Sequence, residues 1–189
     1  MIEIVFFGRG GQGAVTAAQV IATAAFKAGM YAQAFPSFGP ERRGAPVTAY
    51  ARIDHKQIAD RGLIFKADYV IVLDPNVMKT TDPLASVKER GCAIVNSDRL
   101  KKYVIGEARD GNIQVHCINA SAISEQVYGP KAIPITNIAM LGAFSYISHV
   151  VELEDILLSI EDFFSGDRAE EAKTTARMAY GAMAGEKRQ

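Results

Sequence analysis

The chain has 189 residues, of which 49% are hydrophobic and 22% are charged, and its 21 basic residues balance its 21 acidic residues. This length suits one substantial α/β domain and is short for two, and the composition argues against disorder. With no net charge and no run of Lys or Arg, the sequence offers no basic surface for nucleic acid.

The first predicted element is a strand over about residues 2–7, which a glycine-rich loop connects to a helix over roughly 13–28. Small residues recur along this helix, so it can pack close to a sheet, and Gly29 suits its left-handed end. The loop consists of Gly8, Arg9, Gly10, Gly11, Gln12 and Gly13. A glycine loop between a strand and a helix can present free backbone N–H groups, so we expect a ligand or a partner to bind there.

The next predicted strand covers residues 31–35 and leads into residues 36–46, a segment with three prolines and two glycines. That density of breakers predicts no regular element. A half-buried strand is predicted over residues 47–53, where polar and apolar residues alternate. Three apolar runs are typical of central parallel strands covered on both faces, namely residues 69–73, 92–95 and 113–118.

The C-terminal part of the chain is predicted to be helical. Apolar residues recur with helical spacing over 138–151 and again over 153–164. Asp167 and Glu170 have the spacing of a capping box for a last helix that extends to about Ala184. We expect the final three residues to fray.

Strands that alternate with helices predict one α/β domain over residues 1–189, with a Rossmann-like, doubly wound, mostly parallel sheet. Every predicted strand is followed by polar or glycine-rich residues. Ligands bind at the carboxyl edge of such sheets. We therefore expect the glycine loop and the proline-rich segment to lie on one side of the domain.

The sequence predicts no metal site, no membrane span and no cofactor held by this chain alone. Cys92 and Cys117 lie in apolar runs as expected for buried free thiols, and two cysteines cannot supply the four thiolates of an ordinary iron–sulfur cluster. The three histidines lack the spacing of zinc ligands. The most apolar later stretch, residues 135–153, is interrupted by polar residues and indicates a core helix. Without a signal-peptide pattern, we expect a cytoplasmic protein.

The glycine loop matches the G-x-G-x-x-G fingerprint of dinucleotide-binding proteins at Gly8, Gly10 and Gly13. An NAD enzyme places Asp or Glu at the end of the second strand, whereas the first acidic residue after that strand is Glu41. Arginines of the proline-rich segment could bind the 2′-phosphate of NADP, but they lie well beyond the strand. A free-standing NAD(P)-binding oxidoreductase or regulator is therefore an alternative that the sequence does not favour.

Longer blocks of sequence are more specific than the loop. Two blocks carry a resemblance, residues 8–18 and residues 33–47, and the second reads QAFPSFGPERRGAPV. Together they resemble the gamma subunits of the 2-oxoacid:acceptor oxidoreductase family, and pyruvate:ferredoxin oxidoreductase in particular. Residues 134–143 are also similar to that family, and the likeness covers nearly the whole chain. The resemblance implies a subunit that has no catalytic residues of its own and is active only in a complex. Subunits of 2-oxoisovalerate, 2-oxoglutarate or indolepyruvate ferredoxin oxidoreductases are alternatives within the family.

The resemblance also implies the chemistry of the complex. Such complexes decarboxylate pyruvate oxidatively to acetyl-CoA and pass the electrons to ferredoxin. Alpha, beta and delta subunits would hold thiamine diphosphate with Mg and the Fe4S4 clusters, and would contact ferredoxin. The gamma-type chain would contribute a surface that faces coenzyme A or a partner subunit.

The candidate residues for that surface are Gly8, Arg9, Gly10, Gly11, Gln12, Gly13, Ser37, Glu41, Arg42, Arg43 and Gly44. The glycine amides suit a pyrophosphate, and Arg9, Arg42 or Arg43 could pair with phosphate oxygens. Two other interpretations stay open. The charged residues of the proline-rich segment could instead form ion pairs that brace the loop or an interface, and Gln12 could only cap its own loop.

Aromatic residues near the second strand could anchor a partner subunit, although a core role is the default expectation. They are Tyr31, Phe35 and Phe38.

Overall fold

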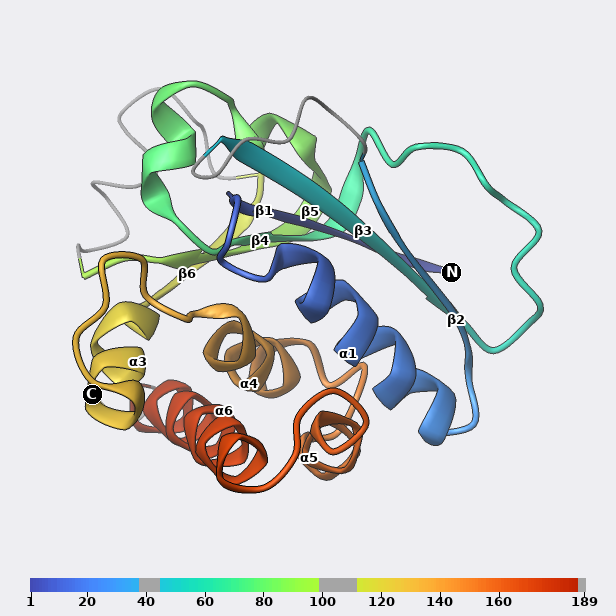
Figure 1. Ribbon diagram of the computed structural model, residues 1–189. Coiled ribbons are helices and arrows are strands. Elements are labelled where there is room, and N and C mark those ends of the chain that lie inside the picture. The colour runs from blue at the N-terminus through green and yellow to red at the C-terminus, as the bar shows by residue number, and fades with distance from the viewer. Residues whose placement is uncertain (38–44, 99–111, 187–189) are drawn as a thin grey trace.

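A computed structural model describes residues 1–37, 45–98 and 112–186 (Figure 1). The strands are β1 (Ile2–Arg9), β2 (Tyr31–Pro36), β3 (Pro46–Asp54), β4 (Ala67–Val72), β5 (Val87–Asn96) and β6 (Gln114–Ile118). The helices are α1 (Ala14–Lys27), α3 (Ala120–Tyr128), α4 (Asn137–Ser148), α5 (Leu153–Ile160) and α6 (Asp167–Glu186), with two 3-10 helices, η1 (Pro75–Lys79) and η2 (Pro83–Ser86).

The six strands form one sheet in the order β2-β3-β1-β4-β5-β6. Strands β1, β4, β5 and β6 are parallel to one another, whereas β3 runs antiparallel to both β1 and β2. The predicted α/β fold with a mostly parallel sheet is confirmed. The antiparallel side arises because β2 and β3 are joined by a short connection, and a parallel pair needs a crossover of a dozen or more residues.

Side chains alternate between the two faces along each strand, and a buried core lies on each face of the sheet. Ile4 and Phe6 of β1 pack into the core beneath the helices, while Val5 faces the opposite core. Figure 1 shows the α-helices on one side of the sheet and the two 3-10 helices on the other. Because the central strands are covered on both faces, they read as continuous apolar runs in the sequence.

The sequence predicts a glycine at the end of α1 and a capping box at the start of α6, and the structure tests both signals. Gly29 has φ +81 after α1, and the amide of Met30 donates to the carbonyl of Ala25 at 3.0 Å, so the predicted left-handed end is confirmed. The predicted capping box is wrong. Helix α6 already includes Asp167, and the Glu170 carboxylate accepts from Lys173 Nζ at 2.8 Å instead of from a backbone amide.

Arg52 of β3 is a buried cation, with 1% of its surface exposed. Its Nε donates to Glu3 Oε1 at 3.1 Å, and its Nη2 lies 3.6 Å from Asp60 Oδ2. Its guanidinium carbon lies 5.4 Å from the centre of the Phe35 ring. Nη1 is buried and has no hydrogen-bond partner among the described residues. Glu3 is less dependent on Arg52, because its Oε2 lies 3.1 Å from Lys88 Nζ.

Substitutions of Glu3 and of Arg52 are expected to lower the free energy of unfolding by unequal amounts. Glu3→Ala leaves Arg52 buried without its closest carboxylate and is expected to lower the free energy of unfolding by about 3 kcal/mol. Arg52→Met keeps the volume apolar and leaves Glu3 with Lys88, so the expected loss is less than about 1 kcal/mol. Urea unfolding of the two variants measures the difference. Equal losses would contradict this account of Arg52.

In the described part of the chain, none of the helices combines the length and the apolar composition that crossing a membrane requires.

Candidate functional site at the carboxyl edge of the sheet

The glycine loop makes a tight turn at the end of β1. The amide of Gln12 donates to the carbonyl of Arg9 at 3.0 Å, and Gly11 adopts φ +96 within that turn. A positive φ at this position is available mainly to glycine. The amide of Gly10 donates to the carbonyl of Ala45 at 2.9 Å, which ties the loop to the residue before β3.

Gly13 lies where the loop enters α1 and contacts the first residue of α4. It has φ +77, and a Cβ placed on it would lie 2.5 Å from Asn137 Nδ2. The same Nδ2 donates to the Gly13 carbonyl at 3.4 Å. Gly13 provides no side-chain cap for α1. The N-terminus of α1 thus keeps unsatisfied backbone N–H groups and the positive end of the helix dipole beside the loop.

Asp74, the second residue after β4, joins several groups of the loop. Its Oδ2 accepts from Arg9 Nε at 2.6 Å and from Gln12 Nε2 at 2.8 Å, and it lies 2.5 Å from Arg9 Nη2. Its Oδ1 accepts from the backbone and side-chain nitrogens of Asn76 at 2.8 and 2.9 Å. Gln12 Oε1 in turn accepts from the Arg9 amide at 2.7 Å. Gln12 therefore caps its own loop, as one of the two interpretations of the sequence has it.

The electrostatics of Asp74 favour its charged form. Burial, which leaves 4% of the residue exposed, raises the pKa of this carboxyl, but hydrogen bonds from Asn76 and Arg9 outweigh it. The net pKa of Asp74 is lowered from its ordinary value. A depressed pKa in the folded state means that the charged form contributes stability above the unfolded-state pKa of about 4, and that this contribution is lost as the pH falls further.

A pH series tests this assignment. At pH 7, Asp74→Asn is expected to lower the free energy of unfolding by about 2 kcal/mol, because charge-assisted hydrogen bonds are lost. As the pH falls from about 4 through the lowered folded-state pKa of Asp74, the wild type progressively loses the same contribution and the two curves approach each other. Unfolding monitored by circular dichroism measures both proteins. A difference that stays constant over the range would rule out a depressed pKa for Asp74.

Polar groups from the neighbouring strands meet at the same edge. The carbonyl of Leu73 accepts from Asn96 Nδ2 at 2.8 Å and from Thr136 Oγ1 at 3.2 Å. Asn96 Oδ1 also accepts from the amide of Ser121 at 3.2 Å. Hydrogen bonds thus join the ends of β4 and β5 to Ser121 of α3 and to Thr136, the residue before α4, and these residues form a platform at this edge.

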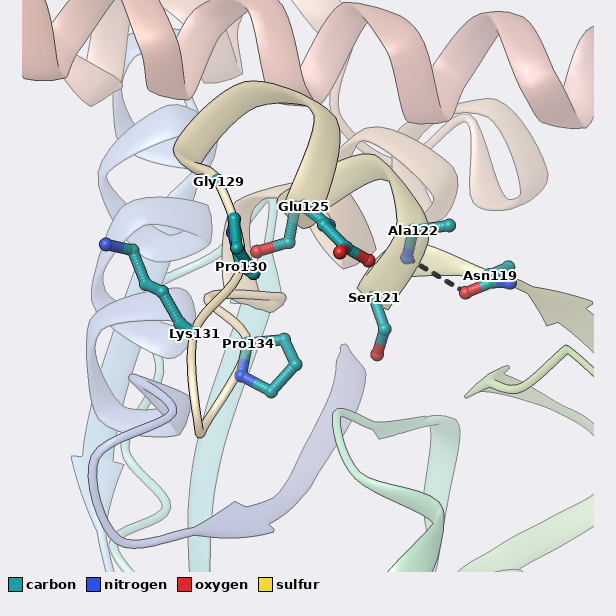
Figure 2. A pocket seen from close by; sticks show the side chains of 9 residues that line it. Asn119, Ser121, Ala122, Glu125, Gly129, Pro130, Lys131 and Pro134 are labelled. Atoms are coloured by element: carbon teal, nitrogen blue, oxygen red, sulfur yellow. Dashed lines mark hydrogen bonds between the residues drawn. The ribbon is translucent and has the colours of Figure 1, made fainter.

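Two cavities open beside the platform. One of about 250 Å³ lies between the first turn of α3 and residues 129–134, with Glu125 and Lys131 among its lining residues (Figure 2). The other, of about 430 Å³, is lined by Asn137, Lys131 and Arg168 among others. Asn137 is 4% exposed, and its Oδ1 has no hydrogen-bond partner among the described residues. A group that donates a hydrogen bond would satisfy this buried oxygen.

Only some of the predicted site residues lie within the described part of the chain. Residues 8–13 form the loop described above. The amide of Ser37 donates to the carbonyl of Thr48 at 2.9 Å, so the start of the proline-rich segment continues the β2–β3 hairpin beside the loop. Glu41, Arg42, Arg43 and Gly44 lie outside the described residues, as does Phe38. Both ends of that segment nevertheless reach the carboxyl edge, because Pro46 pairs with Arg9 in the register of β3 and β1.

The other aromatic residues near β2 differ from each other. Phe35 is half-buried and stacks on Tyr50, with ring centres 5.1 Å apart. Tyr31 is 53% exposed, so the default expectation of a core role is wrong for this residue. Tyr31 is the first residue of the edge strand β2, where its side chain is exposed to solvent.

The cysteines and possible metal ligands do not form a centre in the described residues. Cys92 is buried on β5, as expected, whereas Cys117 on β6 is only partly buried, and neither forms a disulfide. Over residues 1–37, 45–98 and 112–186, no three His, Cys, Asp or Glu side chains come together as metal ligands. This donor set does not fit an iron–sulfur cluster, which needs four thiolates.

Asp74 and Asn137 are the two site residues that sequence reasoning missed. Asp74 is part of the polar sequence Asp-Pro-Asn that ends β4, and Asn137 lies in the third block of family resemblance. Each therefore carried a local signal. Their contacts with the glycine loop, which span 62 and 124 residues along the chain, are visible only in the fold.

A parallel sheet with a glycine loop at its carboxyl edge is typical of nucleotide- and phosphate-binding proteins. The chain belongs to the pyruvate ferredoxin/flavodoxin oxidoreductase family, whose sequence profile matches residues 3–182. The pyruvate/ketoisovalerate oxidoreductases common subunit gamma of Pyrococcus furiosus is 45% identical over 180 residues, which cover 95% of this chain and 96% of that protein. The pyruvate synthase subunit PorC of Methanothermobacter thermautotrophicus is 42% identical over 180 residues, or 95% of this chain and 94% of that protein.

A solved structure agrees with these relatives. The crystal structure of pyruvate oxidoreductase subunit PORC from Thermotoga maritima matches with a TM-score of 0.80 and 32% identity, over 95% of each chain. The resemblance to gamma subunits that the sequence predicts is confirmed. The alternative of a free-standing NAD(P)-binding protein is not favoured.

Proposed function

We propose that the chain is the gamma subunit of a pyruvate:ferredoxin oxidoreductase, and that it contributes a surface facing coenzyme A and its partner subunits. In this proposal, alpha, beta and delta subunits hold thiamine diphosphate, Mg and the Fe4S4 clusters, and ferredoxin contacts those subunits. The complex oxidatively decarboxylates pyruvate to acetyl-CoA. The relatives named for pyruvate synthase and for pyruvate/ketoisovalerate oxidoreductase support this choice of substrate. A cytoplasmic location is part of the proposal, and two cysteines without a disulfide agree with a reducing compartment.

The observation that carries the proposal is the N-terminus of α1, which has no side-chain cap and follows a loop of glycines. Gly13 provides no side-chain cap, and a Cβ on Gly11 would meet nothing within 4 Å, so a pyrophosphate could approach backbone N–H groups of the loop. Coenzyme A supplies such a pyrophosphate and a separate 3′-phosphate. The ends of the segment that contains Arg42 and Arg43 lie beside the same loop, which would bring further positive charge to the site.

The unpartnered oxygen of Asn137 also suits this ligand. Coenzyme A carries amide and hydroxyl donors in its pantetheine arm, whereas inorganic phosphate at neutral pH is mainly an acceptor. The charged residues that line the same cavity are Lys131, Arg168 and Glu171, and this balance of charge would favour an anionic ligand. The donor set of the carboxyl edge therefore fits a phosphorylated molecule with hydrogen-bond donors.

The test is the affinity for coenzyme A in the assembled complex after Arg42→Ala and Arg43→Ala. Each lost phosphate contact is expected to raise the KM for coenzyme A about tenfold. Arg61→Ala, which removes an exposed arginine from a distant loop, is the matched control and should leave the KM unchanged.

The two variants also separate the proposal from the bracing interpretation. If Arg42 and Arg43 only form ion pairs that stabilise an interface, the variants will lower the thermal stability of the complex and leave the KM unaltered. Unchanged KM and unchanged turnover in both variants would overturn the role of these arginines in binding coenzyme A.

A further inference from the structure

We infer that Asp74 is the positioning residue of the glycine loop, and that Arg9 and Gln12 support this loop from behind instead of contacting its ligand. The inference about the loop stands on the geometry alone. Its consequence for coenzyme A rests on the proposed function.

The contacts of Asp74 carry the first step. One carboxylate oxygen accepts from Arg9 and Gln12, which lie at either end of the turn, while the other accepts from Asn76 in η1. The carboxylate is 5% exposed, so water does not compete for these bonds. Asp74 thus attaches the turn at both ends to the end of β4, an element in the centre of the sheet.

The charge of Arg9 is the second reason to assign Arg9 a supporting role. Its Nε and Nη2 both lie against the Asp74 carboxylate, at 2.6 and 2.5 Å, so the two charges neutralise each other. A neutral ion pair attracts a phosphate much less than a free guanidinium does. The affinity of the loop for an anion must then come from backbone N–H groups, whose direction depends on the shape of the turn.

Substitution of Asp74 has opposite consequences in the two possible roles of Arg9. If Arg9 binds the ligand phosphate, Asp74→Asn removes a competing negative charge and frees the guanidinium, so the ligand binds more tightly. If Asp74 positions the loop, the same substitution loosens the turn and the ligand binds more weakly. The sign of the change therefore distinguishes a positioning role from an electrostatic one.

Asp82 offers a matched control. Like Asp74, it precedes a proline and caps a 3-10 helix, with its Oδ1 accepting from the amide of Ala85 at 3.3 Å. It is exposed and caps η2, whereas Asp74 caps η1. Asp82→Asn therefore reproduces the loss of a cap and of one charge without the loss of the loop contacts.

Amide hydrogen exchange of the full chain tests the positioning role directly. In Asp74→Asn, the amides of Arg9 and Gln12 are expected to exchange about tenfold or more faster, because their bonds within the turn are weakened. Amides at the centre of β4 should keep their protection, which shows that the protein stays folded. Asp82→Asn should leave the loop unaffected. Unchanged exchange of the loop in Asp74→Asn would overturn the inference.

Steady-state kinetics of the assembled complex test the consequence for binding. Asp74→Asn and Arg9→Gln are each expected to raise the KM for coenzyme A about tenfold with kcat nearly unchanged, and the double variant should be no worse than either. A lower KM in Asp74→Asn would overturn the inference, because it would show that Arg9 binds the phosphate. If the loop exchanges faster but the KM stays constant, Asp74 positions the loop and the proposed role of that loop in coenzyme A binding fails.

Discussion

Gly142→Ala is expected to be the most destabilising single substitution in the helical layer. A Cβ on Gly142 would lie 2.1 Å from the carbonyl oxygen of Ala176 and 2.9 Å from its carbonyl carbon. The obstacle is the backbone of α6, which cannot rotate away as a side chain can. Helices α4 and α6 would have to separate, and we expect a loss of more than about 3 kcal/mol in the free energy of unfolding.

Gly181→Ala is the matched control for this prediction. Gly181 also lies within a helix, but a Cβ there meets nothing within 4 Å. Because alanine has the higher helix propensity, Gly181→Ala should be neutral or stabilising by up to about 1 kcal/mol. Denaturant unfolding of both variants gives the comparison. A loss within about 1 kcal/mol for Gly142→Ala would contradict the close approach of α4 and α6.

Gly13→Ala is expected to have the second large effect, because two costs combine there. The residue needs φ +77, and its new Cβ would lie 2.5 Å from Asn137 Nδ2. The left-handed backbone alone costs about 1–2 kcal/mol for alanine, and displacing the amide of Asn137 adds about as much again. We expect a total loss of about 3 kcal/mol and a weakened affinity for any ligand of the loop.

Two further variants separate these costs. Gly11 has φ +96 but open space around its Cβ position, so Gly11→Ala should show the backbone cost alone. Asn137→Ala added to Gly13→Ala should relieve the steric part of the loss. Thermal unfolding measures all of these proteins. If Gly11→Ala and Gly13→Ala destabilise equally, the contact with Asn137 does not constrain the loop.

Much of the fold follows from local patterns, but the first half of β5 does not. Apolar runs predict a strand over residues 92–95, whereas β5 begins at Val87. The additional residues include Lys88 and Glu89, whose charges interrupt the apolar run, and Arg90, which adopts φ +61. The amide of Arg90 donates to the carbonyl of Asn112, so a contact distant in sequence holds this irregular part of the strand. Local propensity carries no information about such a contact.

The antiparallel orientation of β3 also cannot be predicted from the local sequence pattern. Alternating polar and apolar residues predict a strand but not its direction. The direction is seen only in the fold, where β3 pairs antiparallel with both β1 and β2.

The candidate site likewise has a part that the sequence predicts and a part that it does not. Gly11 and Gly13 are predictable, since the turn and the start of α1 require their positive φ values. The partner of Arg9 is not, because a free arginine beside a glycine loop suggests a phosphate ligand as readily as an ion pair. Only the folded chain brings Asp74 against it, at 2.6 Å from Nε.

The central claim is that this chain acts as a subunit and not alone. The most direct test measures pyruvate- and coenzyme A-dependent reduction of ferredoxin by the proposed alpha, beta and delta subunits, with and without this chain. We expect full activity only when the chain is present, none from the chain alone, and a preference for pyruvate over 2-oxoglutarate. Full coenzyme A-dependent activity without the chain, or stoichiometric binding of NAD(P)H by the isolated chain, would contradict the account.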